Sequence, residues 1–245
     1  MAEVDVSQEL YKEIKAKYDS AVKSDSQIKS IGSKLKRGRA TPGDIAKLAE
    51  RVGEHASDAL KSVLTVERLP DGIMYWNIAE KTIQPLLTDV YDSINAMAIV
   101  QQRQNDISRS INIGISKGTA PKDRIETVMG FATNSRTPEE LANALDIPVK
   151  TTALDYVDDF EKRNAEVRND LGFVQYVVRE YDGVGLHDGK VPCEWCISRS
   201  GTFEYQDAID KGVFERHNGC GCTIEVITKD DLNNMPDDDV PELPF

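Results

Sequence analysis

The four cysteines of this 245-residue chain all lie in one short segment near its end. Two of them form the motif Cys193-x2-Cys196, and after a long gap a second motif reads His217-x2-Cys220-x-Cys222. Soft ligands at both ends of such a gap allow a tetrahedral metal ion to close a loop that has little core of its own. The spacing predicts a zinc site with five candidate ligands for four positions. We expect Cys193 and Cys196 to bind zinc together with two of the other three.

The first motif and the gap that follows it contain enough aromatic side chains for a miniature core over the metal: Trp195, Phe203, Tyr205 and Phe214. A shell filled by four protein ligands leaves no open position for water or substrate, so the predicted zinc site is structural. The alternative is a set of reduced or disulfide-paired cysteines that bind no metal.

The charge balance and the first residues limit the compartments and binding partners that we expect for the chain. It carries 42 acidic and 30 basic residues, a net charge of −12, and should repel nucleic acid and anionic membranes except at local sites. The first residues are acidic where a secretory signal would be basic, and no stretch reaches the roughly 20 apolar residues of a membrane span. We therefore expect a cytosol-like compartment without membrane contact, where thiols stay reduced and clustered cysteines favour metal.

Residues 1–170 carry the periodicity of a long helical region. Apolar residues recur at every fourth position from Val6 to Val22, which is the spacing of one helical face. A second helix is predicted to begin after Thr41, which serves as its N-cap, with Pro42 at the first helical position.

A long helical pattern then runs through residues 74–113. Pro85 falls inside this pattern and should kink or break the helix, because proline lacks a backbone donor and crowds the preceding turn. The remaining predicted helices cover residues 122–132, 137–145 and 153–172, and the region could be subdivided near 66–73 and 117–122.

Residues 29–44 form a basic, glycine-bearing segment that we interpret as a loop. Its cations could contact phosphates or an acidic partner: Lys34, Lys36, Arg37 and Arg39. So short a run of charge is more often a solvated linker.

The periodicity changes after residue 172, where β-forming side chains from Val174 to Tyr181 predict a strand. The fold class is therefore mainly α: a helical region over 1–170, a small α+β zinc-binding module over 171–228, and an extended acidic tail over 229–245. The tail contains prolines and is interpreted as either disordered or laid on a partner.

His187 and Asp188 offer a different interpretation, because they follow the predicted strand beside the cysteine motifs. In some metal-dependent nucleases of the HNH type, a histidine in this position activates water. Such a site also needs a second histidine and an asparagine on the next helix. The chain offers only His217 and Asn218 for these roles, and His217 is a predicted zinc ligand.

The segments "VVREYDGVGLHDGKVPCEWCISRSGTFEY" and "GVFERHNGCGCTIEV" resemble the C-terminal zinc-knuckle module of tailed-phage minor capsid, or head morphogenesis, proteins related to the F protein of phage Mu. The resemblance is close from residue 156 onward and general upstream. The knuckle positions match Cys193, Cys196, His217, Cys220 and Cys222. Asn218 departs from the proline that often follows the histidine.

This resemblance implies a structural virion protein with no catalytic residues. It would be made in the cytoplasm of a bacterial host and occupy the phage head near the portal vertex, in low copy. Its partners would be the portal protein, the major capsid protein, or both, with local contact to packaged DNA through the four cations of residues 29–44. The resemblance leaves open whether the protein is ejected from the head together with the DNA. A host-type zinc-finger adaptor that binds another protein through the acidic tail is a further interpretation.

Overall fold

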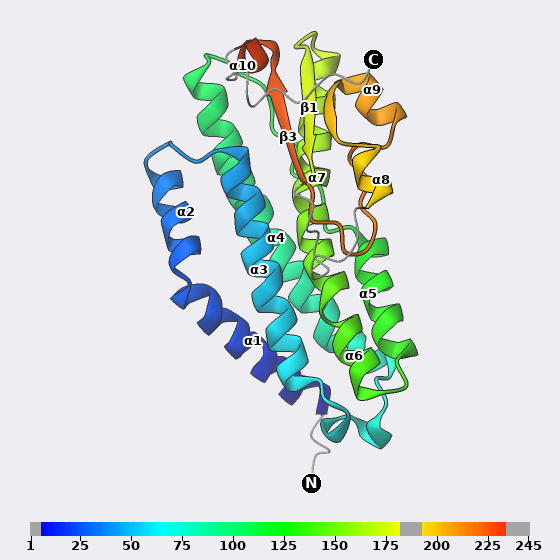
Figure 1. Cartoon of the computed structure of the whole chain (residues 1–245). Coiled ribbons are helices and arrows are strands. Elements are labelled where there is room, and N and C mark those ends of the chain that lie inside the picture. Colours follow the sequence, from blue (N-terminus) through cyan, green and yellow to red (C-terminus); the bar gives the residue numbers. More distant parts are fainter. Residues whose placement is uncertain (1–5, 182–192, 234–245) are drawn as a thin grey trace.

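A computed structural model describes residues 6–181 and 193–233. The fold is mainly helical, with a small three-stranded sheet near the C-terminus (Figure 1). This confirms the fold class predicted from the sequence. No helix within the described residues is long and apolar enough to cross a membrane.

The long N-terminal region consists of α1 (Val6–Ser24), α2 (Ser26–Lys36), α3 (Pro42–Val63), the short turns η1 (Val66–Arg68) and η2 (Pro70–Gly72), α4 (Trp76–Ser108), α5 (Lys122–Asn134), α6 (Pro138–Ala144) and α7 (Ile147–Asp170). The C-terminal part consists of β1 (Gln175–Glu180), α8 (Glu194–Ile197), β2 (Gly201–Glu204), α9 (Tyr205–Asp210), β3 (Thr223–Thr228) and α10 (Lys229–Asn233).

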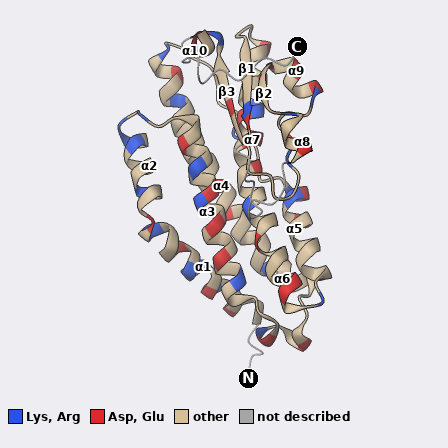
Figure 2. Cartoon of the chain, in the orientation of Figure 1, with Lys and Arg blue, Asp and Glu red and all other residues tan. Residues whose placement is uncertain are grey.

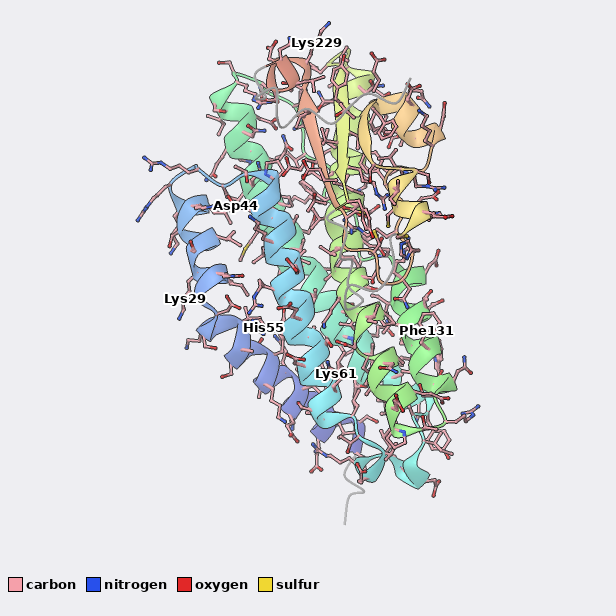
Figure 3. The ribbon with its side chains drawn as sticks, viewed as in Figure 1. Lys29, Asp44, His55, Lys61, Phe131 and Lys229 are labelled. Atoms are coloured by element: carbon pink, nitrogen blue, oxygen red, sulfur yellow. The ribbon has the colours of Figure 1, made fainter. Side chains whose placement is uncertain are left out.

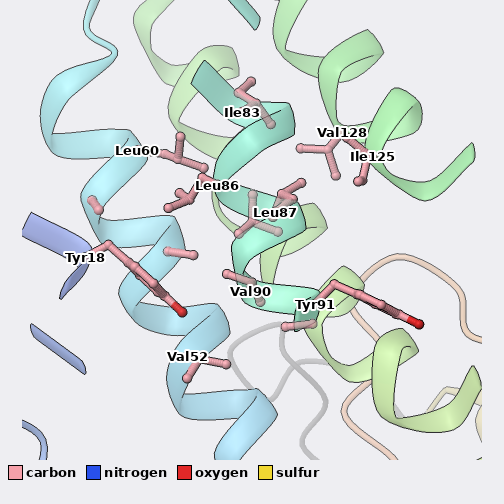
Figure 4. Packing of buried hydrophobic residues seen from close by; sticks show 14 of the residues in the cluster. Tyr18, Val52, Leu60, Ile83, Leu86, Leu87, Val90, Tyr91, Ile125 and Val128 are labelled. Carbon is pink, nitrogen blue, oxygen red and sulfur yellow. The ribbon is translucent and has the colours of Figure 1, made fainter. Parts of the chain in front are cut away.

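The helical region has one large apolar core, to which α1, α3, α4, α5 and α7 all contribute. Leu60 of α3 and Leu86 and Val90 of α4 are fully buried in it (Figure 4). Tyr91 and Tyr156 meet edge to face, with ring centroids 5.1 Å apart, and so join α4 to α7. The predicted apolar stripes are therefore the faces that the helices turn towards one another.

The segment that we interpreted as a loop from residue 29 is helical as far as Lys36, so this prediction was wrong for most of its basic part. Helix α2 begins after Asp25, whose Oδ1 accepts hydrogen bonds from the backbone amides of Gln27 and Ile28. Its apolar residues are buried against the bundle: Ile28, Ile31 and Leu35. The charges between them concealed this helical spacing in the sequence.

The helix α2 ends in a tight turn at Gly38, whose φ of 66° favours glycine. Lys36, Arg37 and Arg39 are exposed around this turn, and Figure 2 shows basic residues in blue along the ribbon between α2 and α3. Lys34 instead pairs with Asp44 at the start of α3, with 2.6 Å between Nζ and Oδ1. Asp44 and His55, both on α3, are labelled in Figure 3.

Pro85 does not break α4, because the helix runs through it without interruption and is 33 residues long in total. Its neighbours Ile83, Leu86 and Leu87 are all 0% exposed. Burial of these large side chains outweighs the loss of one backbone hydrogen bond at the proline.

Helix α7 lies between the bundle and the C-terminal module, and it contacts α3, α4, β1, β3 and α9. It ends near Gly172 (φ 84°) as predicted but starts six residues before the predicted 153. Its buried polar residues include Asp155, Asp158, Glu161, Asn164 and Arg168. The module covers part of this polar face, where Asp158 pairs with Arg216.

The strands form an antiparallel sheet in the order β2-β1-β3. In the central strand, Val177 pairs with Phe203 on one side and Val226 on the other. A small apolar core lies beneath the sheet and includes Ala165 of α7. The module is thus built onto α7.

The predicted tail does not begin as an extended chain, because its first five residues form α10. Asp231 Oδ2 accepts hydrogen bonds from the backbone amide of Thr228, at 2.9 Å, and from its hydroxyl, at 2.7 Å. This local capping starts the helix. Residues 234–245 lie outside the described residues.

Candidate metal centre

Two short motifs position the candidate ligands. Cys193 is the N-cap of α8, and its Sγ accepts a hydrogen bond from the backbone amide of Cys196 at 3.3 Å. His217 and Cys220 belong to one turn, closed by the Cys220 amide and the His217 carbonyl at 3.1 Å. Gly219 has a φ of 86° inside this turn, a conformation that favours glycine. The two-residue spacing in each motif thus places the two candidate ligand side chains on the same side of their turn.

The structure brings all five predicted ligands together in two overlapping triads. Cys193, Cys196 and His217 form one, and Cys196, Cys220 and Cys222 form the other, with the ligand atoms of each triad within 4.8 Å of one another. Cys196 belongs to both. The five side chains therefore form one compact cluster that could bind a metal ion.

The distances suit a small tetrahedral ion. Sγ of Cys196 lies 3.8 Å from Sγ of Cys220. Two sulfurs at zinc-binding distance would be about 3.8 Å apart at the tetrahedral angle. Nε2 of His217 lies 3.1 Å from Sγ of both Cys193 and Cys196, so a bound ion would spread these two pairs slightly.

Surrounding groups fix the orientation of the first triad. Nδ1 of His217 lies 2.9 Å from the carbonyl oxygen of Asn218. Donation from Nδ1 to this carbonyl leaves Nε2 with a lone pair for a metal. The ring of Trp195 packs edge to face on the imidazole, with centroids 5.1 Å apart, and the backbone amide of Cys193 donates to the hydroxyl of Tyr181 at 3.0 Å.

Two buried arginines surround Cys220. Nη2 of Arg179 lies 3.2 Å from its Sγ, and Nη1 of Arg216 lies 3.8 Å from the same atom. Arg216 also forms a buried ion pair with Asp158 of α7, with 3.0 Å between Nη2 and Oδ1. A second link is the backbone amide of Gly219, which donates to Oγ1 of Thr151 at 3.0 Å. The candidate metal centre is therefore attached to α7 by two contacts, the ion pair of Arg216 with Asp158 and the hydrogen bond from Gly219 to Thr151.

The environment separates the pKa values of the thiols. A hydrogen bond from Cys222, with the charges of Arg216 and Arg179, lowers the pKa of Cys220 to about 4. Burial and a hydrogen bond with Cys193 raise the pKa of Cys196 to about 12. The hydrogen bond to Cys220 and burial raise the pKa of Cys222. Without metal, Cys220 is thus the thiolate of its triad, and thiolates are the form that binds metal.

The aromatic residues of the gap divide between two places. Trp195 packs against the cysteines, as predicted. Phe203, Tyr205 and Phe214 belong instead to the core under the sheet, so they do not form a core over the metal. His187 and Asp188 lie outside the described residues.

Sequence reasoning missed Arg179, Arg216 and their partner Asp158. One signal was available for Arg179, because it lies two residues after Val177 on β1 and alternate residues of a strand share a face. The side chains of Val177 and Arg179 are both 0% exposed. Asp158 and Arg216 carried no such local signal, because they meet only after the module packs on α7.

The chain matches no profile of a known protein family, and no curated protein or solved structure matches it either.

Proposed function

We propose that this chain is a structural, non-catalytic component of a tailed-phage head that acts in head assembly near the portal vertex. The observation that carries the proposal is the compact cluster of Cys193, Cys196, His217, Cys220 and Cys222. These are the five positions at which the sequence resembles the zinc-knuckle module of head morphogenesis proteins. The proposal therefore rests on the resemblance, and the proximity of the five matching residues in the structure supports it.

The metal that we propose for this cluster is zinc in a structural role. Thiolates and an imidazole are ligands that zinc prefers, and four protein ligands complete its tetrahedron. Cys196, Cys220 and Cys222 are each 1% exposed, which leaves little access for a substrate. The module has a small apolar core of its own, so a metal that joins α8 to the turn before β3 would supply much of its stability.

The long helices are the proposed contact surface for the portal or major capsid protein. Basic residues at the α2–α3 turn would supply local contact with packaged DNA. Lys36, Arg37 and Arg39 are exposed there, whereas Lys34 is held by Asp44. With a net charge of −12, the rest of the molecule would not coat DNA.

Mass spectrometry of particles assembled by the genome that encodes this chain tests the proposal. We expect the chain in purified particles at low copy, and fewer filled heads when its gene is deleted, restored by a copy supplied in trans. Absence from particles, with normal yield in the deletion strain, would contradict the proposal. Comparison with emptied particles then separates a resident protein, which stays, from an ejected one, which is lost.

A further inference from the structure

One charged side chain at the metal centre has no anionic partner among the described residues. Arg179 is 0% exposed, and its guanidinium donates hydrogen bonds to the backbone carbonyls of Val213 and Glu215 and to Sγ of Cys220. The carbonyl oxygens accept from Nη1 but carry no net charge, and the buried Nε has no hydrogen-bond partner among the described residues. A buried cation without an anion is strongly unfavourable, so its counter-ion must be sought in the cluster.

Two ion pairs lie near the cluster, one buried and one with an exposed arginine. Arg216 forms its ion pair with Asp158, and Nε of Arg124 lies 3.4 Å from Oδ2 of Asp155. These two pairs carry no net charge. Arg179 therefore places one unmatched positive charge beside the sulfurs.

We infer, on the premise of the proposed zinc site, that the centre carries a single negative charge and that Arg179 is its counter-ion. Zn²⁺ with three thiolates and one neutral imidazole has a net charge of −1, which matches Arg179. Four thiolates would leave a second negative charge unmatched in a buried site. Two thiolates with neutral ligands would leave Arg179 without an anion.

The contacts assign the three thiolates to Cys193, Cys196 and Cys220, with His217 as the fourth ligand. Cys220 Sγ lies 3.8 Å from Cys196 Sγ and accepts hydrogen bonds from two guanidinium groups. Such N–H donors orient and stabilise metal-bound ligands. Cys222 belongs to the same triad as Cys196 and Cys220 but also lines a cavity of about 300 Å³ between α3 and the sheet. It stays an unligated thiol.

Paired variants of the full chain test the ligand assignment. We expect wild type and Cys222→Ser each to retain one zinc per chain, and Cys220→Ser to bind zinc at least about 100-fold more weakly in competition with a chelator. The cobalt-loaded wild type and Cys222→Ser should both show charge-transfer intensity for three thiolates.

Three results would overturn the assignment. They are loss of zinc in Cys222→Ser with retention in Cys220→Ser, cobalt intensity for four thiolates, and unchanged zinc affinity in His217→Ala. A wild-type chain that binds no zinc would instead refute the proposed site itself. The two failures are therefore distinguishable.

Substitutions at Arg179 test the counter-ion. Arg179→Met should weaken zinc binding about 10-fold or more, and the charge-conserving Arg179→Lys should restore most of the affinity. Arg199→Met is the matched control, because Arg199 also stacks on Trp195, at 4.0 Å against 5.0 Å for Arg179. Wild-type affinity in Arg179→Met would overturn the inference. If that variant does not fold, Arg179→Lys decides, since affinity more than about 10-fold below wild type would refute a role of charge.

Discussion

Glu161 shows how a single buried residue couples the stability of this protein to pH. Its side chain is 3% exposed and lines a small cavity between α7 and β3, and none of the described residues donates a hydrogen bond to it. Burial, and then the negative charge of Glu225, raises the pKa of Glu161 to about 8. The folded chain thus keeps this carboxyl protonated at neutral pH, whereas the unfolded chain ionises it.

The sign of the resulting pH dependence follows by linkage. Glu161 destabilises the fold progressively as pH rises from its ordinary value of 4.5 to about 8. We expect Glu161→Gln to increase the free energy of unfolding, by on the order of 2 kcal/mol at pH 8, with much less effect at pH 4.5. Urea denaturation across this range measures the effect. Glu166→Gln, an exposed change on the same helix, is the control, and equal pH slopes for both variants would contradict the prediction.

Residue-level prediction from sequence succeeded where the signal was local. The cluster of five candidate ligands was found because their spacing within two short motifs is itself the signature of a site. Arg216 and Asp158 could not be paired from sequence, because they are 58 positions apart and become neighbours only through packing.

Helix α2 depends on one carboxylate at its N-terminus. Besides capping the helix, Oδ2 of Asp25 lies 2.7 Å from Nη2 of Arg51 and 2.8 Å from Nε2 of His55 on α3. Burial alone would raise the pKa of Asp25, but hydrogen bonds from the Ile28 amide, Arg51 and His55 lower it below its ordinary value. Asp25 therefore stabilises the fold above its ordinary pKa, and this contribution is lost as pH falls through the lowered value.

We predict that Asp25→Ala lowers the free energy of unfolding by about 1–3 kcal/mol, because it removes both the cap and the partner of Arg51. Asp25→Asn keeps a capping oxygen and should cost less. Asp19→Ala is the control, since the Asp19 side chain is 54% exposed in its pair with Lys15, and such pairs contribute little. Denaturation at pH 7 compares the three, and equal losses for Asp25→Ala and Asp19→Ala would refute this role.

For whole helices, prediction from the sequence succeeded where the apolar stripe was long or the N-cap was clear, as for α3 and α6. It failed for α2, where lysines and arginines surround the buried positions, and the break allowed at Pro85 does not occur, because packing outweighs a local preference. The first difference comes from charged residues that mask a local apolar spacing, and the second comes from tertiary contacts that a local pattern does not contain.

In the whole molecule, two cores of unequal size meet along α7. The bundle has a large apolar core, whereas the module combines a small one with the cysteine cluster. The module should therefore depend on metal far more than the bundle does.

We predict that the double variant Cys193→Ser and Cys196→Ser loses metal and unfolds the module but keeps most of the helical signal in circular dichroism. Limited proteolysis should cut it after residue 170 while the bundle persists, and a chelator should reproduce this pattern in the wild type. Ser198→Ala, on the exposed side of the same knuckle, is the matched control and should behave as wild type. Loss of the whole helical signal in one transition would contradict the prediction.

The buried polar face of α7 also has a consequence for synthesis. A ribosome completes α7 before it makes the strands and cysteines that cover that face. Asp158 and Glu161 keep this part of the helix hydrated during the interval, as apolar residues would not. The nascent bundle thus presents a water-compatible surface at this place until the module packs on it, and that packing is the closing step of its biogenesis.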